Sequence, residues 1–365
     1  MLGRDTASQF ARHVVAAGLA GPSGLVPGLD AAGHRRAPQA RGVTDPAAMT
    51  DLSRALRDRL AQACTITTPE VVRRDVSVDG TTKYLLRLAD DRHVEAVYIP
   101  DTPKQTFCIS TQAGCAMRCA FCLTGKMGLL RNLRPGEIVG QVRVLARDLD
   151  LLAAPFNIVL MGMGEPLHNY DHTMAALRIL ADPAGFGLPA RRVTLSTVGV
   201  LPGLERLAAE PYMPNLAVSL HATTEDMRDR LVPVNRRYGL ADLVAACARF
   251  PVKRRNRITF EYVLLAGVND TDADARRLVA LIAPVRAKVN LIPFNEAAGL
   301  PFSRPSDARV DAFARHLAER GGRASVRKSR GRDIRAACGQ LLVEGGRRSP
   351  AQRMATLMEQ AGFNR

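Results

Sequence analysis

Residues 107–122 read FCISTQAGCAMRCAFC, the end of a short β-branched run followed by three cysteines in CxxxCxxC spacing, Cys115, Cys119 and Cys122. Three thiolates can hold three corners of a [4Fe-4S] cluster, whereas a fully ligated ferredoxin cluster takes four cysteines. One iron is therefore left open. Because the amino and carboxylate groups of S-adenosylmethionine (SAM) can chelate such an iron, the spacing predicts a cluster and SAM as cofactors. Reductive cleavage of SAM would then give a 5′-deoxyadenosyl radical.

Two other uses of these cysteines are weaker. A structural zinc site would need a fourth ligand from elsewhere, and zinc motifs usually contain two cysteine pairs at matched spacing, whereas no second pair occurs here. A disulfide framework is disfavoured because seven cysteines is an odd number in a chain of 365 residues and no secretory signal precedes them. We therefore expect a reducing compartment and a cytoplasmic location.

Composition predicts a basic globular protein with a polyanionic partner. A hydrophobic fraction of 47% over 365 residues is enough for one large domain and a small one. No run of about 20 apolar residues indicates a membrane span. The net charge of +16 favours nucleic acid as a partner. Only six of the 51 basic residues are lysine, a bias typical of a GC-rich genome, so the total charge is more informative than the choice of arginine.

The order of predicted elements favours an α/β fold. Apolar β-branched runs are predicted as strands at Thr106–Ser110, Ile158–Met161, Val193–Ser196, Leu216–Leu220, Ile258–Leu265 and Val289–Pro293. Segments with helical spacing follow at Pro135–Leu149, His172–Asp182, Leu240–Phe250, Thr271–Ala283 and Asp307–Glu319. Six βα units predict a parallel sheet in a partial (βα)6 barrel, with the cysteine loop at the carboxyl end of the first strand.

The predicted organisation has three parts. Residues 1–92 form a small N-terminal accessory and RNA-binding region, in which 1–50 are poorly defined and Thr50–Ala63 is a capped helix. Residues 93–341 form the core, and 342–365 form a C-terminal tail.

Seven motifs resemble one family over about residues 50–341. They are FCISTQAGCAMRCAFCLTGKMGLLRNL (107–133), MGMGEPLHNY (161–170), LSTVGVLPGL (195–204), LAVSLHATTEDMRDRLVPVN (216–235), EYVLLAGVNDT (261–271), NLIPFN (290–295) and RGRDIRAACGQL (330–341). In order and register they resemble the RlmN/Cfr family of radical-SAM RNA adenosine methyltransferases. EPLHNY and NLIPFN are more similar to RlmN than to Cfr.

The resemblance implies a role for ten further residues. Implied SAM contacts are Gly164, Glu165, Ser196, Ser219, Leu220, His221 and Asn295. Cys338 matches the methyl-carrying cysteine, Cys108 its resolving partner and Glu95 the proton acceptor. Without the family, a lone histidine or cysteine is more often a buried core residue, and Glu95 would be an exposed residue of an alternating strand. Cys64 and Cys247 are interpreted as buried core residues of this kind.

The implied reaction is methylation of an adenosine at carbon 2, where a polar methyl transfer is not feasible. A first SAM would methylate Cys338, and a radical from a second SAM would activate that methyl group for addition to the ring. Cys108 would then attack Cys338, forming a disulfide and releasing the product. The implied partners are 23S rRNA, possibly tRNA as well, and an electron donor such as flavodoxin or ferredoxin. The protein is expected to be a monomer without membrane contact.

Two alternatives stay open at this point. One is methylation at carbon 8, as in Cfr, and the other is a non-catalytic iron-sulfur or zinc RNA-binding protein. The chain also departs from the family before residue 50, because it lacks the tryptophan-containing segment that helps to bind RNA. Arg35, Arg36 and Arg41 could supply phosphate contacts in its place.

Overall fold

The computed structural model describes residues 45–48, 53–63, 67–100, 105–152, 154–183, 185–253 and 255–343. The expectations for Arg35, Arg36, Arg41, Cys64 and the tail beyond 343 lie outside these ranges. No helix of the described part is long and apolar enough to cross a membrane.

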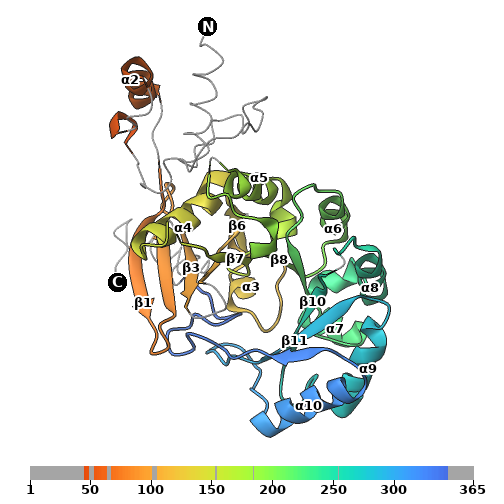
Figure 1. Cartoon of the computed structure of the whole chain (residues 1–365). Coiled ribbons are helices and arrows are strands. Elements are labelled where there is room, and N and C mark those ends of the chain that lie inside the picture. The colour runs from red at the N-terminus through yellow and green to blue at the C-terminus, as the bar shows by residue number, and fades with distance from the viewer. Residues whose placement is uncertain are drawn as a thin grey trace, which may run out of the picture.

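One ten-stranded sheet runs through the molecule, and its strands neighbour each other in chain order (Figure 1). The strands are β1 Glu70–Val76, β2 Thr82–Arg87, β3 His93–Ile99, β4 Thr106–Cys108, β7 Asn157–Leu160, β8 Val193–Thr197, β9 Asn215–Ser219, β10 Ile258–Leu264, β11 Ala287–Pro293 and β12 Ala324–Val326. Pairing is antiparallel from β1 to β4 and parallel from β4 to β12. A second, two-stranded sheet pairs β5 Gln112–Gly114 with β6 Leu129–Asn132.

Helices connect the parallel strands and cover their outer side (Figure 1). These helices are α4 Pro135–Asp148, α5 Tyr170–Ala181, α6 Leu201–Ala208, α7 Glu225–Leu231, α8 Leu240–Arg249, α9 Asp272–Ile282 and α10 Asp307–Glu319. Helix α2 Arg54–Ala63 precedes β1, and α3 Leu123–Met127 lies between β5 and β6. Short 3-10 turns are η2 Pro46–Ala48, η3 Pro166–Asn169, η4 Ala190–Arg192 and η5 Pro233–Arg236. The expected α/β fold of a partial (βα)6 barrel is confirmed.

The six predicted strands form because each carries apolar residues that are buried in the core. Leu160, Leu216 and Phe260, which lie on one face of the sheet, are almost inaccessible to solvent. Thr271 is the N-cap of α9, since its hydroxyl accepts a hydrogen bond from the Asp274 amide at 3.1 Å.

The three antiparallel strands β1–β3 continue the core sheet at its β4 edge. Cross-strand pairing sets Asp75 opposite Lys83, Lys83 opposite Val97, and Val97 opposite Cys108. Because paired residues point to the same face of a sheet, this face carries both Cys108 and polar residues of the first strands. The boundary expected at residues 92/93 falls between β2 and β3, which pair along their length.

Candidate active site

The three motif cysteines lie on a loop between β5 and β6 that is closed at its base. The Cys115 amide donates to the Gly128 carbonyl at 3.0 Å. Gly114 has a φ of +78°, and a Cβ atom there would lie 1.9 Å from the same carbonyl oxygen. Only glycine therefore fits the first position of the loop.

The cysteine loop opens into a cavity. The rest of its wall comes from the carboxyl ends of the parallel strands and from the C-terminal part of the chain. Ten of the predicted site residues line it: Cys115, Cys119, Cys122, Gly164, Glu165, Ser196, Ser219, His221, Asn295 and Cys338. The fold thus brings together residues from most of the predicted motifs.

The donor set in this wall suits a cluster more than a single ion. Burial raises the pKa of Cys115 to about 12, and it also raises the pKa of Cys119 and of Cys122. Because these thiols are protonated, metal binding would release protons. No group of three or more His, Cys, Asp or Glu side chains in the described ranges could hold a metal ion. In a [4Fe-4S] cluster each cysteine binds a different iron, so the thiols need not converge on one point.

Gly164 and Glu165 form the floor of the cavity after β7. Gly164 has a φ of +104°, and a Cβ atom there would lie 2.6 Å from the Gln112 side chain, so the backbone can turn here only with glycine. Glu165 is 3% exposed, and its two carboxylate oxygens accept the amides of Leu167 and Val198 at 3.0 and 2.9 Å. Burial raises the pKa of Glu165 to about 7, so a cationic ligand would favour its ionised form.

His221 is a neutral hydrogen-bond donor in the opposite wall. Its Nδ1 accepts the Val263 amide at 3.0 Å, which leaves the proton on Nε2. Burial, and to a lesser degree Arg228, lowers the pKa of His221 to about 3. Its φ of +59° is unusual for a residue other than glycine, and Phe121 packs edge-on against the ring.

Leu220 is fully buried and does not line the cavity of the cysteine loop. Its carbonyl accepts from the guanidinium of Arg228 at 3.2 Å, and Arg228 also donates to the carbonyls of Val198 at 2.7 Å and Ser219 at 3.2 Å. One buried cation thus holds the ends of β8 and β9 together.

The C-terminal residues 327–343, here called the closing segment, pack across the sheet face that carries Cys108. Asp333 accepts from the Ser77 hydroxyl at 2.6 Å and from the Val78 amide at 3.2 Å. The Thr124 hydroxyl donates to the Leu341 carbonyl at 2.7 Å. These bonds tie the closing segment to the first strands on one side and to the cysteine loop on the other.

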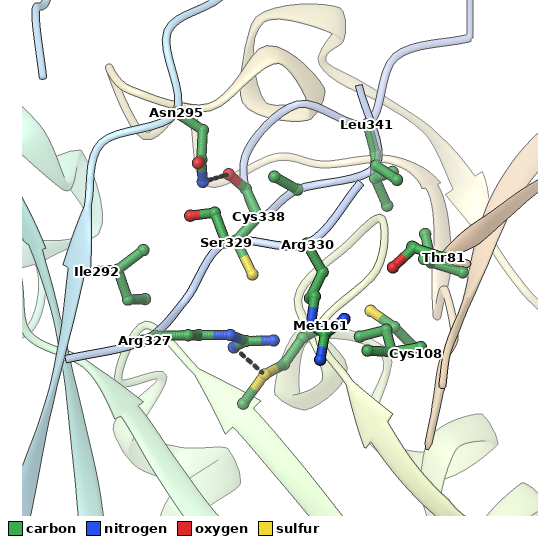
Figure 2. Close-up of a pocket in the computed structure, with 14 residues that line it drawn as sticks. Thr81, Cys108, Met161, Ile292, Asn295, Arg327, Ser329, Arg330, Cys338 and Leu341 are labelled. Carbon is green, nitrogen blue, oxygen red and sulfur yellow. Dashed lines mark hydrogen bonds between the residues drawn. The ribbon is translucent and has the colours of Figure 1, made fainter. Parts of the chain in front are cut away.

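Cys338 and Cys108 line a second, smaller cavity beneath the closing segment (Figure 2). Met161, Ile292, Asn295, Arg327 and Cys338 belong to the walls of both cavities. Cys338 therefore stands between the cysteine loop and Cys108.

All six cysteines of the described ranges are free. The disulfide expected between Cys108 and Cys338 is thus absent from the structure, which gives it no support as a standing bond. Burial raises the pKa of Cys108 to about 12, so this thiol is protonated at neutral pH. Cys247 is buried in the core, as expected.

Arg327 is a cationic residue that lines both cavities. Its interaction with Cys338 is the main cause that raises the pKa of Arg327. Burial opposes this rise, and Glu261 and Cys108 add to it. Arg327 donates to the Met161 sulfur at 3.9 Å, and Figure 2 shows its side chain extending beneath Cys338.

Glu95 lies in a third pocket, on the other side of the closing segment. The pocket is lined by Arg73, Asp75, Lys83, Leu85, Glu95, Asp333, Ile334, Arg335, Gln340 and Leu342. Glu95 is 1% exposed, and its Oε2 accepts the Leu342 amide at 2.8 Å. The structure therefore places Glu95 beside the segment that carries Cys338 but outside the cavity of Cys338.

Three residues around the site were not predicted from sequence: Lys83, Arg228 and Arg327. Arg228 and Arg327 resemble many other arginines in an arginine-rich chain, so composition hid them. Lys83 carried a weak signal, because the alternation of TKYLLR (82–87) puts it on the face of the apolar Leu85.

Comparison with known proteins supports a single assignment. Residues 109–279 match the Radical SAM superfamily. The chain is 50% identical to the dual-specificity RNA methyltransferase RlmN of Jannaschia sp. (strain CCS1), covering 86% of this chain and 83% of the relative. It is 49% identical to the protein of the same name from Anaeromyxobacter dehalogenans (strain 2CP-C), covering 87% of each. The crystal structure of a radical SAM methyltransferase from Sphaerobacter thermophilus is similar with a TM-score of 0.79 and 48% identity, over 82% of this chain and 89% of that one.

Proposed function

The chain belongs to the RlmN family of dual-specificity RNA methyltransferases, and we propose on that basis that it methylates carbon 2 of adenosine in 23S rRNA and in tRNA. The observation that carries the proposal is the shared wall of two cavities. Cys338 lines both the cavity of the three motif cysteines and the cavity of Cys108, so one residue can receive a methyl group on one side and be resolved on the other.

Cys115, Cys119 and Cys122 would hold a [4Fe-4S] cluster in this site. Gly164, Glu165, Ser196, Ser219, His221 and Asn295 would hold SAM, with Leu220 supporting the wall. Bound together, the two groups supply the 5′-deoxyadenosyl radical and exchange single electrons with the reacting base. Glu165 suits the amino group of SAM because a buried carboxylate gains most from a cationic partner.

Cys338 acts as the nucleophile and carrier. Its thiolate takes a methyl group by displacement. After this carbon has lost a hydrogen atom and joined carbon 2 of the base, the C2–H bond breaks and Glu95 takes the proton. Cys108 then gives up its proton and attacks the sulfur of Cys338. An S–S bond forms, the S–C bond breaks, and the carbon takes the electron pair and a proton, which completes the methyl group on the base. A dithiol reductant restores both thiols.

Glu95 must come within reach of the base for this role. In the structure its Oε2 is occupied by the Leu342 amide, so RNA binding would have to displace the end of the closing segment. The bound adenosine would also have to be unstacked, at a cost of a few kcal/mol.

The remaining proposals concern context. We propose residues 1–92 as an accessory region for RNA binding, 93–341 as the catalytic core and 342–365 as a tail. A flavodoxin or ferredoxin would supply electrons to a monomeric enzyme in the cytoplasm, where its RNA substrates are found.

Nucleoside analysis tests the proposed reaction. Reconstituted holoenzyme, SAM, a reductant and undermethylated bacterial RNA should yield 5′-deoxyadenosine and 2-methyladenosine, identified against carbon 2 and carbon 8 standards. 8-Methyladenosine would replace this proposal with the Cfr-like reaction. Absence of 5′-deoxyadenosine would favour a non-catalytic RNA-binding protein.

A further inference from the structure

We propose that Lys83 is a positioning residue for the proton transfer to Glu95, an inference that rests on the role proposed for Glu95. Lys83 lies on β2 and Glu95 on β3, two residues apart in register on the same face of the sheet. The Lys83 Nζ atom is 3.1 Å from Glu95 Oε1, and their side chains are 7% and 1% exposed. This is a buried ion pair in the wall of the third pocket.

The two oxygens of Glu95 have different surroundings. Oε2 accepts the amide of Leu342. Oε1 lies 3.1 Å from the Lys83 ammonium, whose charge and hydrogen bond both lower the pKa of Glu95. Oε1 has no other hydrogen-bond partner within the described part of the chain, so its second lone pair can take a proton.

Lys83 sets both the charge and the direction of this carboxylate. Burial raises the pKa of Glu95, and the charge of Lys83 opposes that rise. Without the ammonium, a carboxyl group this deeply buried would be protonated over a wider pH range and could not act as a base. With the ammonium present, Glu95 stays ionised until the C2–H bond of the base breaks. The electron pair of that bond then remains on the ring, and the proton moves to Oε1.

The other charged groups around the pocket lie beyond this pair. From β1, Arg73 pairs with Asp75 at 3.1 Å, and Asp75 is 3.9 Å from Lys83. From the closing segment, Asp333 is held by Ser77 and Val78, and Arg335 is exposed. Arg73 also lowers the pKa of Glu95, but by less than Lys83 does, which leaves Lys83 as the principal cation at Oε1.

The test uses reconstituted holoenzyme and undermethylated RNA with hydrogen or deuterium at carbon 2 of adenine. In Lys83→Met, the acid limb of the pH profile for product formation should move up by about 1–3 pH units, the effect of losing a close opposite charge. The deuterium isotope effect and the ratio of 5′-deoxyadenosine to methylated product should both rise, because proton removal becomes slower than the steps before it. Methylation of Cys338 should be unchanged.

Three variants make the result specific. Lys83→Arg keeps the charge and should keep the acid limb. Lys83→Gln removes the charge but keeps a polar side chain, so it tests the proposal if Lys83→Met does not fold. Arg87→Met, on the same strand, removes an exposed cation paired with Glu70 and should behave as the unaltered enzyme.

A folded Lys83→Met or Lys83→Gln enzyme with an unchanged pH profile and product ratio would overturn the proposal. So would unfolding of both together with a fully active Lys83→Arg, because that result assigns the pair to stability alone. If Glu95→Gln is as active as the unaltered enzyme, the role proposed for Glu95 fails instead. If Glu95→Gln is inactive but Lys83→Met behaves as the unaltered enzyme, only the role proposed for Lys83 is rejected.

Discussion

Cys108 and Cys338 line one cavity, but they are needed at different stages of the proposed reaction. Cys108→Ala should still bind RNA, cleave SAM and form the new carbon-carbon bond, and should then remain covalently linked to RNA through Cys338. A denaturing gel would show a slow band that nuclease removes. Cys338→Ala should give no such band, because it has no carrier sulfur.

Cys247→Ala is the matched control for these two variants, since it removes a buried thiol from the core helix α8. It should turn over without trapping RNA. Normal turnover by Cys108→Ala, or a trapped species in the Cys108→Ala/Cys338→Ala double variant, would contradict the methylene-transfer reaction.

Glu165 and His221 should give the protein without cluster opposing pH dependences. The pKa of Glu165 is raised from 4.5 to about 7, so the folded state holds this proton more tightly and loses stability as the pH rises through that window. The pKa of His221 is lowered from 6.5 to about 3, so the folded state loses stability as the pH falls through that window. Between pH 4.5 and 6.5 the two effects oppose each other.

A single variant separates the two contributions. Relative to the unaltered protein, Glu165→Gln should have a free energy of unfolding about 3 kcal/mol higher at pH 8 than at pH 4, because it lacks the cost of ionising Glu165. Urea unfolding of both proteins at the two pH values measures this difference. Curves that stay parallel would show that Glu165 is not strongly perturbed.

At the scale of elements, the closing segment depends on a few polar anchors. Asp333→Ala removes two hydrogen bonds to the turn between β1 and β2. Alkylation of the half-buried Cys338 by iodoacetamide should therefore become several-fold faster. Asp311→Ala, at an exposed position on α10, should leave the rate unchanged, and equal rates for the two variants would show that Asp333 does not hold the segment.

Helices and strands were predictable from sequence where buried apolar residues recur at regular spacing. The six core strands were found within two residues of their ends because runs such as Ile258–Leu264 carry an apolar or aromatic residue at every second position. β12 was missed because all three of its residues are exposed. The extension of the sheet by β1–β3 was also missed, because the charged run RRD (73–75) hides the alternation. The pairing of Lys83 with Glu95 depends on strand register, which a single sequence does not contain.

At the scale of the whole molecule, the net charge of +16 should make RNA binding strongly dependent on salt. Each phosphate contact releases counterions, so a surface with 6–10 contacts loses about 10³–10⁵ in affinity between 50 and 200 mM salt. Filter binding of tRNA to the full chain at the two concentrations measures this loss. Binding of SAM to the same preparation is the control and should vary far less, and equal salt dependence for both ligands would argue against a phosphate-binding surface.

The strands of the large sheet neighbour each other in chain order from β1 to β12, which has a consequence for synthesis on the ribosome. Chains emerge from the N-terminus, and domains form as their segments become available. Here every new strand finds its partner already at the growing edge, and none has to insert between two strands that are paired. The closing segment leaves the ribosome after all twelve strands. Until then the loop of Cys115, Cys119 and Cys122 is uncovered on the side where Cys338 will lie, so the nascent chain presents these three cysteines before it presents Cys338.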